Sequence, residues 1–147
     1  MSIEGARVLD LYAGSGALGL EALSRGAASA DLVEKSRAAA AVVRKNATLV
    51  TATRGVGTAH VHERPVRGFL ETAQGPFDLV FSDPPYGLAD ADMTADLETL
   101  APLLSADAVV IIERGRRESA PDFAAAGLEP WRERRYGDTT LWWGAPA

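Results

Sequence analysis

The chain has 147 residues, of which 47% are hydrophobic and 24% are charged, and its formal net charge is −5. These values are typical of a globular protein and predict one domain spanning residues 1–147. Because there is no cysteine, disulfides, thiolate metal sites and cysteine nucleophiles are excluded. No apolar run approaches the roughly 20 residues that span a bilayer, and no signal peptide is recognisable, so we expect a cytoplasmic protein without membrane contacts.

Strand and helix patterns alternate through the first half of the chain. We expect strands at 7–11, 29–33 and 59–62, a helix over 17–25 that ends at Gly26, and a helix over 36–49. Ser36 is suited to be the N-cap of the second helix. A glycine turn at 13–16 follows the first strand, and residues 51–57 are expected to form a loop.

The second half continues the alternation and ends differently. We expect a short helix at 68–73, strands at 77–81 and 108–112, an acidic loop at 87–92 between them, and strands at 128–136 and 139–143. Leu97, Leu100 and Leu104 have helical spacing, with Pro102 ending or kinking that helix. Pro121 suits the first turn of a short helix that stops at Gly127. Gly137-Asp138 is a hairpin signal between the last two strands.

Five strands in crossover units followed by an antiparallel hairpin are the element order of a class I methyltransferase domain. The predicted fold is therefore α/β and Rossmann-like, with a mostly parallel seven-stranded sheet and a C-terminal antiparallel hairpin. Fold alone does not define chemistry.

The glycine turn predicts a nucleotide-type cofactor. Residues 14–19 fit the pattern G-x-G-x-x-G after a strand, and Glu34 follows Gly14 by twenty residues, as in dinucleotide-binding proteins. Asp10, just before the turn, would repel a pyrophosphate but would favour the ammonium of S-adenosylmethionine. The pattern therefore favours S-adenosylmethionine over NAD. Two plainer interpretations stay open: Asp10 caps the turn, and Glu34 is a solvated acid at a strand end.

The adenine pocket is expected in the loop at 63–66, near Leu11 and Phe81. Since Pro65 has no N–H, Val66 or Arg64 would donate the main-chain hydrogen bond. The candidate cofactor-binding residues are Asp10, Tyr12, Gly14, Ser15, Gly16, Glu34, Lys35, Val66 and Asp83.

A second motif, Ser82-Asp83-Pro84-Pro85-Tyr86, follows the buried strand at 77–81. Two successive prolines stiffen the backbone. The rigid segment places a carboxylate, outward-pointing carbonyls and an aromatic ring together, which suits a planar amine: Asp83 and the Pro84 carbonyl accept its hydrogens and Tyr86 stacks on its ring. The candidate catalytic residues are Asp83, Pro84, Pro85 and Tyr86. The alternative is an ordinary proline-rich strand exit.

The distribution of charged residues and the two histidines indicate less about function than the two motifs do. Residues 68–113 hold nine acids and no Lys or Arg, whereas six of the fifteen basic residues fall within 114–135. These are Arg114, Arg116, Arg117, Arg132, Arg134 and Arg135. They form either a phosphate-contacting patch or a solvated surface. His60-Val61-His62 lacks acidic or thiol partners in a metal-binding pattern, so we expect no metal site.

Residues 8–27, together with Asp83-Pro84-Pro85-Tyr86 and residues 135–139, closely resemble the RsmD family of bacterial 16S rRNA guanine-N2 methyltransferases. The resemblance covers most of the chain, from about residue 5 to residue 143. It implies methylation of the exocyclic amine of one guanine, with S-adenosylmethionine as the methyl donor. The family's cofactor positions correspond to Asp10, Gly14, Gly16 and Glu34, and its catalytic motif to residues 83–86.

The resemblance implies 16S rRNA, or an assembly particle of the small ribosomal subunit, as the partner, and we expect a monomer. Family members usually carry a basic arm before the first strand; here that strand begins within the first seven residues, so we expect the arm to be absent. Two alternatives remain: an adenine-N6 DNA methylase, which shares the Asp-Pro-Pro-aromatic motif, and a non-catalytic module that binds S-adenosylmethionine or NAD.

Overall fold

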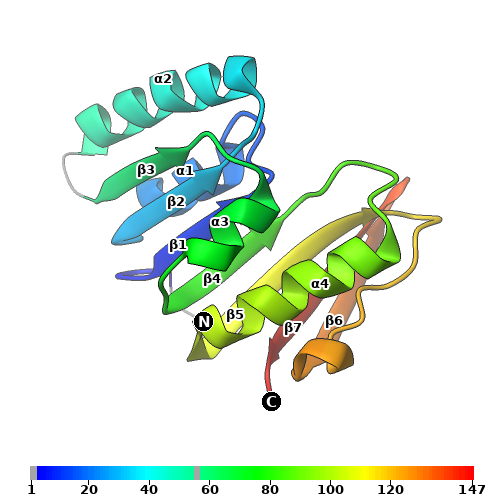
Figure 1. Ribbon diagram of the computed structural model, residues 1–147. Helices are drawn as coiled ribbons and strands as arrows, with labels where there is room; N and C mark the ends of the chain where they lie inside the picture. The colour runs from blue at the N-terminus through cyan, green and yellow to red at the C-terminus, as the bar shows by residue number, and fades with distance from the viewer. Residues whose placement is uncertain (1–2, 55–56) are drawn as a thin grey trace.

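A computed structural model of the chain describes residues 3–54 and 57–147. Its centre is a seven-stranded sheet with the order β3-β2-β1-β4-β5-β7-β6 (Figure 1). The strands are β1 (Arg7–Leu11), β2 (Ser29–Val33), β3 (Thr58–His62), β4 (Phe77–Ser82), β5 (Leu104–Gly115), β6 (Leu128–Tyr136) and β7 (Thr139–Pro146). Strands β1 to β5 are parallel, whereas β7 pairs antiparallel with both β5 and β6. The predicted fold class and terminal hairpin are confirmed.

Helices cover both faces of the sheet. They are α1 (Ala17–Ser24), α2 (Arg37–Arg54), α3 (Val66–Thr72) and α4 (Asp90–Leu100), with 3-10 turns η1 (Ala101–Leu103) and η2 (Ala124–Ala126). Helices α1 and α2 lie on one face and α3 and α4 on the other (Figure 1). Among the residues that the structure describes, no helix is long and apolar enough to cross a membrane.

Two hydrophobic clusters, one on each face, explain why the central strands are apolar throughout. In β1, Val8 packs toward α1 and α2 while Leu9 packs toward α3 and α4, and both are fully buried. A parallel strand covered on both faces needs apolar side chains at successive positions instead of at alternate ones. The sequence pattern of β1, β4 and β5 follows from this burial.

Several predicted boundaries are wrong. Helix α2 continues to Arg54, so the loop expected at 51–57 is helical in its first four residues, and residues 55–56 lie outside the described range. The hydroxyls of Thr51 and Thr53 donate to the carbonyls of Ala47 and Leu49, four residues earlier. These bonds satisfy the threonine hydroxyls inside a helix, which removes their usual preference for a turn.

The regions around the prolines also differ from prediction. Helix α3 starts at Val66, directly after Pro65, and α4 starts inside the expected acidic loop, where Asp90 and Asp92 favour a helix N-terminus. Beyond α4 the chain forms η1, so Leu104 belongs to β5, which runs far beyond the expected 108–112. Pro121 precedes η2 instead of lying in its first turn.

Gly144 in β7 provides a stability test of the packing beneath the hairpin. A Cβ added there would lie 2.5 Å from Phe123 Cε1, and the Phe123 ring is fully enclosed in the core. We expect Gly144→Ala to lower the free energy of unfolding by about 1–3 kcal/mol, because the buried ring would have to shift to make room for the methyl group. Urea denaturation measures the change; an unaltered midpoint would contradict this packing.

Candidate functional site

The carboxyl end of β1 continues into a tight turn held by main-chain bonds. The N–H of Ala13 donates to the Val33 carbonyl at 2.9 Å, and the Gly16 N–H donates to the Ala13 carbonyl at 2.8 Å. Gly16 has φ +82°, and an added Cβ would lie 3.1 Å from both Leu32 and Val43 side-chain carbons. Glycine is therefore required at residue 16 by conformation and by space.

Asp10 lies beneath this turn and caps helix α1. Its side chain is only 2% exposed, and Oδ2 accepts a hydrogen bond from the Gly19 N–H at 3.0 Å. Burial raises the pKa of Asp10 to about 7, although the Gly19 bond opposes this shift. An added Cβ at Gly19 would lie 3.1 Å from Asp10 Cβ, so the third glycine of the motif lets α1 pack closely on β1. Asp10 therefore caps the first turn of α1, whereas the plainer interpretation had it capping the glycine turn itself.

Glu34, at the end of β2, links the glycine turn to the start of α2. Its Oε1 accepts from the Gly14 N–H at 3.1 Å and its Oε2 accepts from the Ser36 N–H at 2.7 Å. Each carboxylate oxygen has a further lone pair, so Glu34 could still accept hydrogen bonds from hydroxyls of a ligand. The carboxylate is half-buried and is held in place from two sides.

An open pocket of about 660 Å³ lies between the strand ends and helices α3 and α4. We call it the α3–α4 pocket; it is lined by Tyr12, Lys35, Pro65, Val66, Arg67, Glu71, Pro85, Leu88, Asp92, Ala95 and Asp96. It brings together three residues predicted to bind cofactor, Tyr12, Lys35 and Val66, with Pro85 of the second motif.

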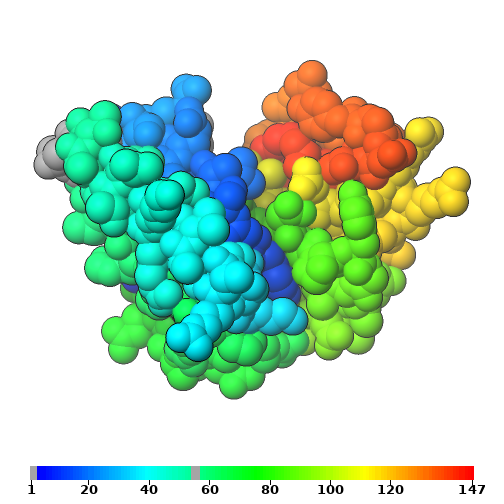
Figure 2. Space-filling view, turned by 90° about the horizontal axis from the view of Figure 1, so that it is seen from above, coloured from blue at the N-terminus to red at the C-terminus, as the bar shows by residue number. Residues whose placement is uncertain are grey.

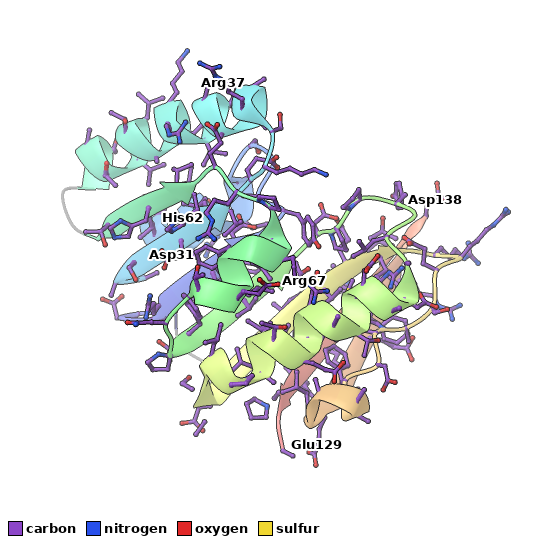
Figure 3. The ribbon with its side chains drawn as sticks, in the orientation of Figure 1. Asp31, Arg37, His62, Arg67, Glu129 and Asp138 are labelled. Atoms are coloured by element: carbon purple, nitrogen blue, oxygen red, sulfur yellow. The ribbon has the colours of Figure 1, made fainter. Side chains whose placement is uncertain are left out.

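Tyr12, Asp96 and Arg67 form a hydrogen-bonded group in this pocket that the sequence did not predict. The Tyr12 hydroxyl donates to Asp96 Oδ2 at 2.7 Å, and Arg67 Nε lies 3.3 Å from Asp96 Oδ1. Figure 3 shows Arg67 on α3 in the space next to α4. Burial raises the pKa of both Tyr12 and Asp96, and the neighbouring Asp96 carboxylate raises that of Tyr12 further. Tyr12 has φ +58°, so the turn and this bond together fix its ring.

A second open pocket, of about 860 Å³, lies on the other side of the second motif. We call it the hairpin pocket; it is lined by Tyr86, Gly87, Gly115, Arg116, Arg117, Glu118, Arg135 and Asp138. The Tyr86 side chain is 76% exposed. Pro85 lines one pocket and its neighbour Tyr86 lines the other, so the motif forms the boundary between them.

Asp83 lies next to the carboxylate of Glu113, which no sequence motif placed in the site. In the β4–β5 register Ser82 is opposite Ile112, so the next residues along the two strands, Asp83 and Glu113, are neighbours. The pKa of Asp83 is raised to about 7 by desolvation, then by hydrogen bonding to and repulsion from Glu113, and by Asp10. The available signal was that the two apolar runs 77–81 and 108–112 are each followed by an acid within two residues.

The buried side chain of Arg114 connects β5 to the loop that follows the second motif. Its side chain is 3% exposed; Nη2 donates to Glu118 Oε2 at 2.7 Å and to the Leu88 carbonyl at 3.1 Å, and Nη1 lies 3.5 Å from Asp90. Glu118 also accepts from the N–H groups of Gly115 and Gly87. Arg114 is therefore excluded from the predicted phosphate-contacting patch, and it is not part of a solvated surface either.

The other five arginines separate into two groups. Arg132 lies over the Trp143 ring and Arg134 over the Tyr136 ring, each 4.8 Å from the ring centroid. Arg116, Arg117 and Arg135 line the hairpin pocket. The six arginines predicted as one patch therefore have three different environments: one is buried, two stack on aromatic rings of the hairpin, and three line the hairpin pocket.

Both histidines lie on β3, away from the two pockets described above. His62 Nε2 is 2.8 Å from Asp31 Oδ1, and its ring packs against Phe69 (Figure 3). Among the described residues, no group of three or more His, Asp or Glu side chains is arranged to hold a metal ion.

The strand order and the glycine turn after β1 define a class I methyltransferase fold. Residues 1–144 match the model of the family described as Conserved hypothetical protein 95, and the chain belongs to this family, the RsmD family. The resemblance inferred from the motifs is confirmed.

Individual relatives agree with this assignment. Ribosomal RNA small subunit methyltransferase D of Escherichia coli K12 is 38% identical over 120 residues, which cover 82% of this chain and 59% of that protein. A conserved hypothetical protein of Streptococcus pyogenes superposes with a TM-score of 0.87 at 35% identity, covering 99% of this chain and 89% of its own. A ribosomal protein L11 methylase of Lactobacillus delbrueckii, with a TM-score of 0.73, 20% identity and coverage of 97% and 71%, shows the fold alone.

Proposed function

We propose that the protein transfers a methyl group from S-adenosylmethionine to the exocyclic amine of a guanine in small-subunit rRNA. The observation that carries this proposal is the position of Asp83-Pro84-Pro85-Tyr86 between two pockets, with Pro85 facing one and Tyr86 the other. A transferase that joins two ligands needs such a boundary. The chain spans 59% of the length of its E. coli relative, whose name specifies small-subunit rRNA.

The α3–α4 pocket and the glycine turn fit S-adenosylmethionine. Glu34 would accept hydrogen bonds from the ribose hydroxyls through its remaining lone pairs. Val66 is the first residue of α3, so its N–H belongs to those that a helix leaves without an intrahelical partner, and it would donate to the adenine ring. Tyr12 and Lys35 complete the walls. Bound there, S-adenosylmethionine supplies an electrophilic methyl group.

The second motif would orient the guanine amine. This nitrogen is a weak nucleophile because its lone pair is delocalised into the ring. Asp83 and the Pro84 carbonyl would accept its two hydrogens and direct the lone pair toward the methyl group, while the exposed Tyr86 ring stacks on the base. Such stacking contributes about 1–3 kcal/mol for an unstacked base. Orientation of this kind can lower a barrier by about 7–11 kcal/mol.

Glu34→Ala tests the cofactor assignment. We expect the dissociation constant for S-adenosylmethionine, measured by calorimetry, to rise at least about tenfold, since hydrogen bonds to a charged group contribute about 1.5–3 kcal/mol. Glu21→Ala removes an equal charge at an exposed position on α1 and is the matched control. An unaltered dissociation constant in Glu34→Ala would exclude the ribose role.

The reaction itself is tested by incubating the protein with isotopically labelled S-adenosylmethionine and either small-subunit rRNA or DNA. Label in N2-methylguanosine of the RNA is the expected product. Label in N6-methyladenine of the DNA would instead identify an adenine methylase. Binding of the donor without product on either substrate would indicate a non-catalytic module.

A further inference from the structure

We infer that Arg116, Arg117 and Arg135 form a wall of the hairpin pocket that binds the backbone phosphates flanking the target base. This inference rests on the proposed function and names the residues that would hold the RNA strand.

The fold brings these arginines together from two separate segments. Arg116 and Arg117 follow β5 directly, whereas Arg135 lies near the end of β6. The Arg116 N–H donates to the Asp138 carbonyl at 2.7 Å, which joins the turn after β5 to the turn of the β6–β7 hairpin. Figure 3 shows Asp138 at the tip of that hairpin. This bond fixes the main chain that carries Arg116 against the hairpin turn before any ligand binds.

The three guanidinium groups are available to a ligand. Within residues 3–54 and 57–147, no carboxylate lies within 4.0 Å of any of them. The nearby acid Glu118 is instead occupied by Arg114 and two main-chain N–H groups. Three unpaired arginines in one pocket of a chain with net charge −5 are a local concentration of positive charge. Guanidinium groups match phosphate geometry with paired hydrogen bonds.

The same pocket contains the aromatic ring expected to hold the base. Tyr86 packs over Gly115, where an added Cβ would lie 2.9 Å from Tyr86 Cε1, so the absence of a side chain at residue 115 gives the ring its place beside Arg116. Positive groups next to an exposed aromatic ring are the usual elements of a site for single-stranded nucleic acid. Figure 2 shows a hollow between the blue-to-cyan half of the molecule and the half that carries α4 and the hairpin; all residues of the hairpin pocket belong to the second half.

The test is fluorescence anisotropy with a fluorescein-labelled RNA stem-loop that has unpaired guanines in its loop, titrated at several salt concentrations. We expect Arg116→Ala, Arg117→Ala and Arg135→Ala each to weaken binding several-fold. The triple variant should reduce the slope of log affinity against log salt by about 2, since each phosphate contact on a single strand contributes about 0.7. Arg25→Ala makes the same charge change at the C-cap of α1, which packs over β1 and β2 away from the hairpin, and as the matched control it should keep the wild-type slope.

Folding and the proposed function are monitored separately. Calorimetric binding of S-adenosylmethionine should be unchanged in the triple variant, which shows that the fold is intact. A wild-type slope in the folded triple variant, or no binding of the stem-loop by the wild type, would overturn the phosphate assignment even if methyl transfer is observed. If the arginines were required for binding of the stem-loop but no methylated product formed, the proposed function would be refuted while the phosphate assignment would be supported.

Discussion

Asp83→Ala is expected to lower the single-turnover rate of methyl transfer by about 10²–10³-fold, the range typical of losing one preorganised hydrogen-bonding group that acts in the transition state. Its carboxylate is the acceptor that would hold and orient the amine, and the rigid Pro84-Pro85 segment cannot replace it. Asp83 was also a candidate cofactor residue, but it does not line the α3–α4 pocket, and its carboxylate neighbours Glu113 of β5, whereas Glu34 is bonded to the glycine turn. We therefore expect the affinity for S-adenosylmethionine to remain at the wild-type value.

The control for this variant is Asp107→Ala. Asp107 is an exposed acid at the opposite end of β5, and its replacement should leave the rate unchanged. If Asp83→Ala instead lost affinity for S-adenosylmethionine together with activity, the role of Asp83 would be structural.

The second large effect is the dependence of the rate on pH. The pKa of Asp83 is raised to about 7, so the carboxyl is mostly protonated below that pH and ionised above it. Only the ionised form accepts hydrogen bonds through both oxygens. We therefore expect kcat/KM to fall up to tenfold for each pH unit below 7 and to reach a plateau above it.

Glu113→Gln should move this midpoint to lower pH. The substitution removes the negative charge beside Asp83 and leaves an amide that can donate to the ionised carboxylate, and both changes favour the charged form. Glu129→Gln on β6 removes a charge far from the motif and should leave the profile unchanged (Figure 3). A profile with the same midpoint in Glu113→Gln would show that another group controls the rate.

The order of strands and helices could be predicted because it is encoded locally. Apolar runs such as 77–81 mark buried strands, and glycines and prolines mark the turns between them. The glycine turn could be assigned for the same reason: the requirement for glycine at residue 16 follows from backbone conformation and from the strand before it. The end of α2 was predicted wrongly because its threonines bond their hydroxyls to carbonyls four residues earlier within the helix, whereas threonine alone suggested a loop.

The environment of the site residues could not be predicted, because it depends on contacts between distant parts of the chain. The bond from Tyr12 to Asp96 joins residues 84 positions apart, and nothing near Asp96 in the sequence distinguishes it from the other acids of α4. The neighbours Asp83 and Glu113 are set by the β4–β5 register. Arg114 looked like its neighbours in a basic segment, yet it is buried and braces the loop that carries Tyr86.

The most direct measurement is mass spectrometry of 16S rRNA from cells that lack this protein, compared with cells that regain either the wild type or Asp83→Ala. We expect one guanine to lose its N2-methyl group in the deletion strain. The wild type should restore this methyl group and Asp83→Ala should not. An unchanged set of methylated guanines in the deletion strain would contradict the proposed function.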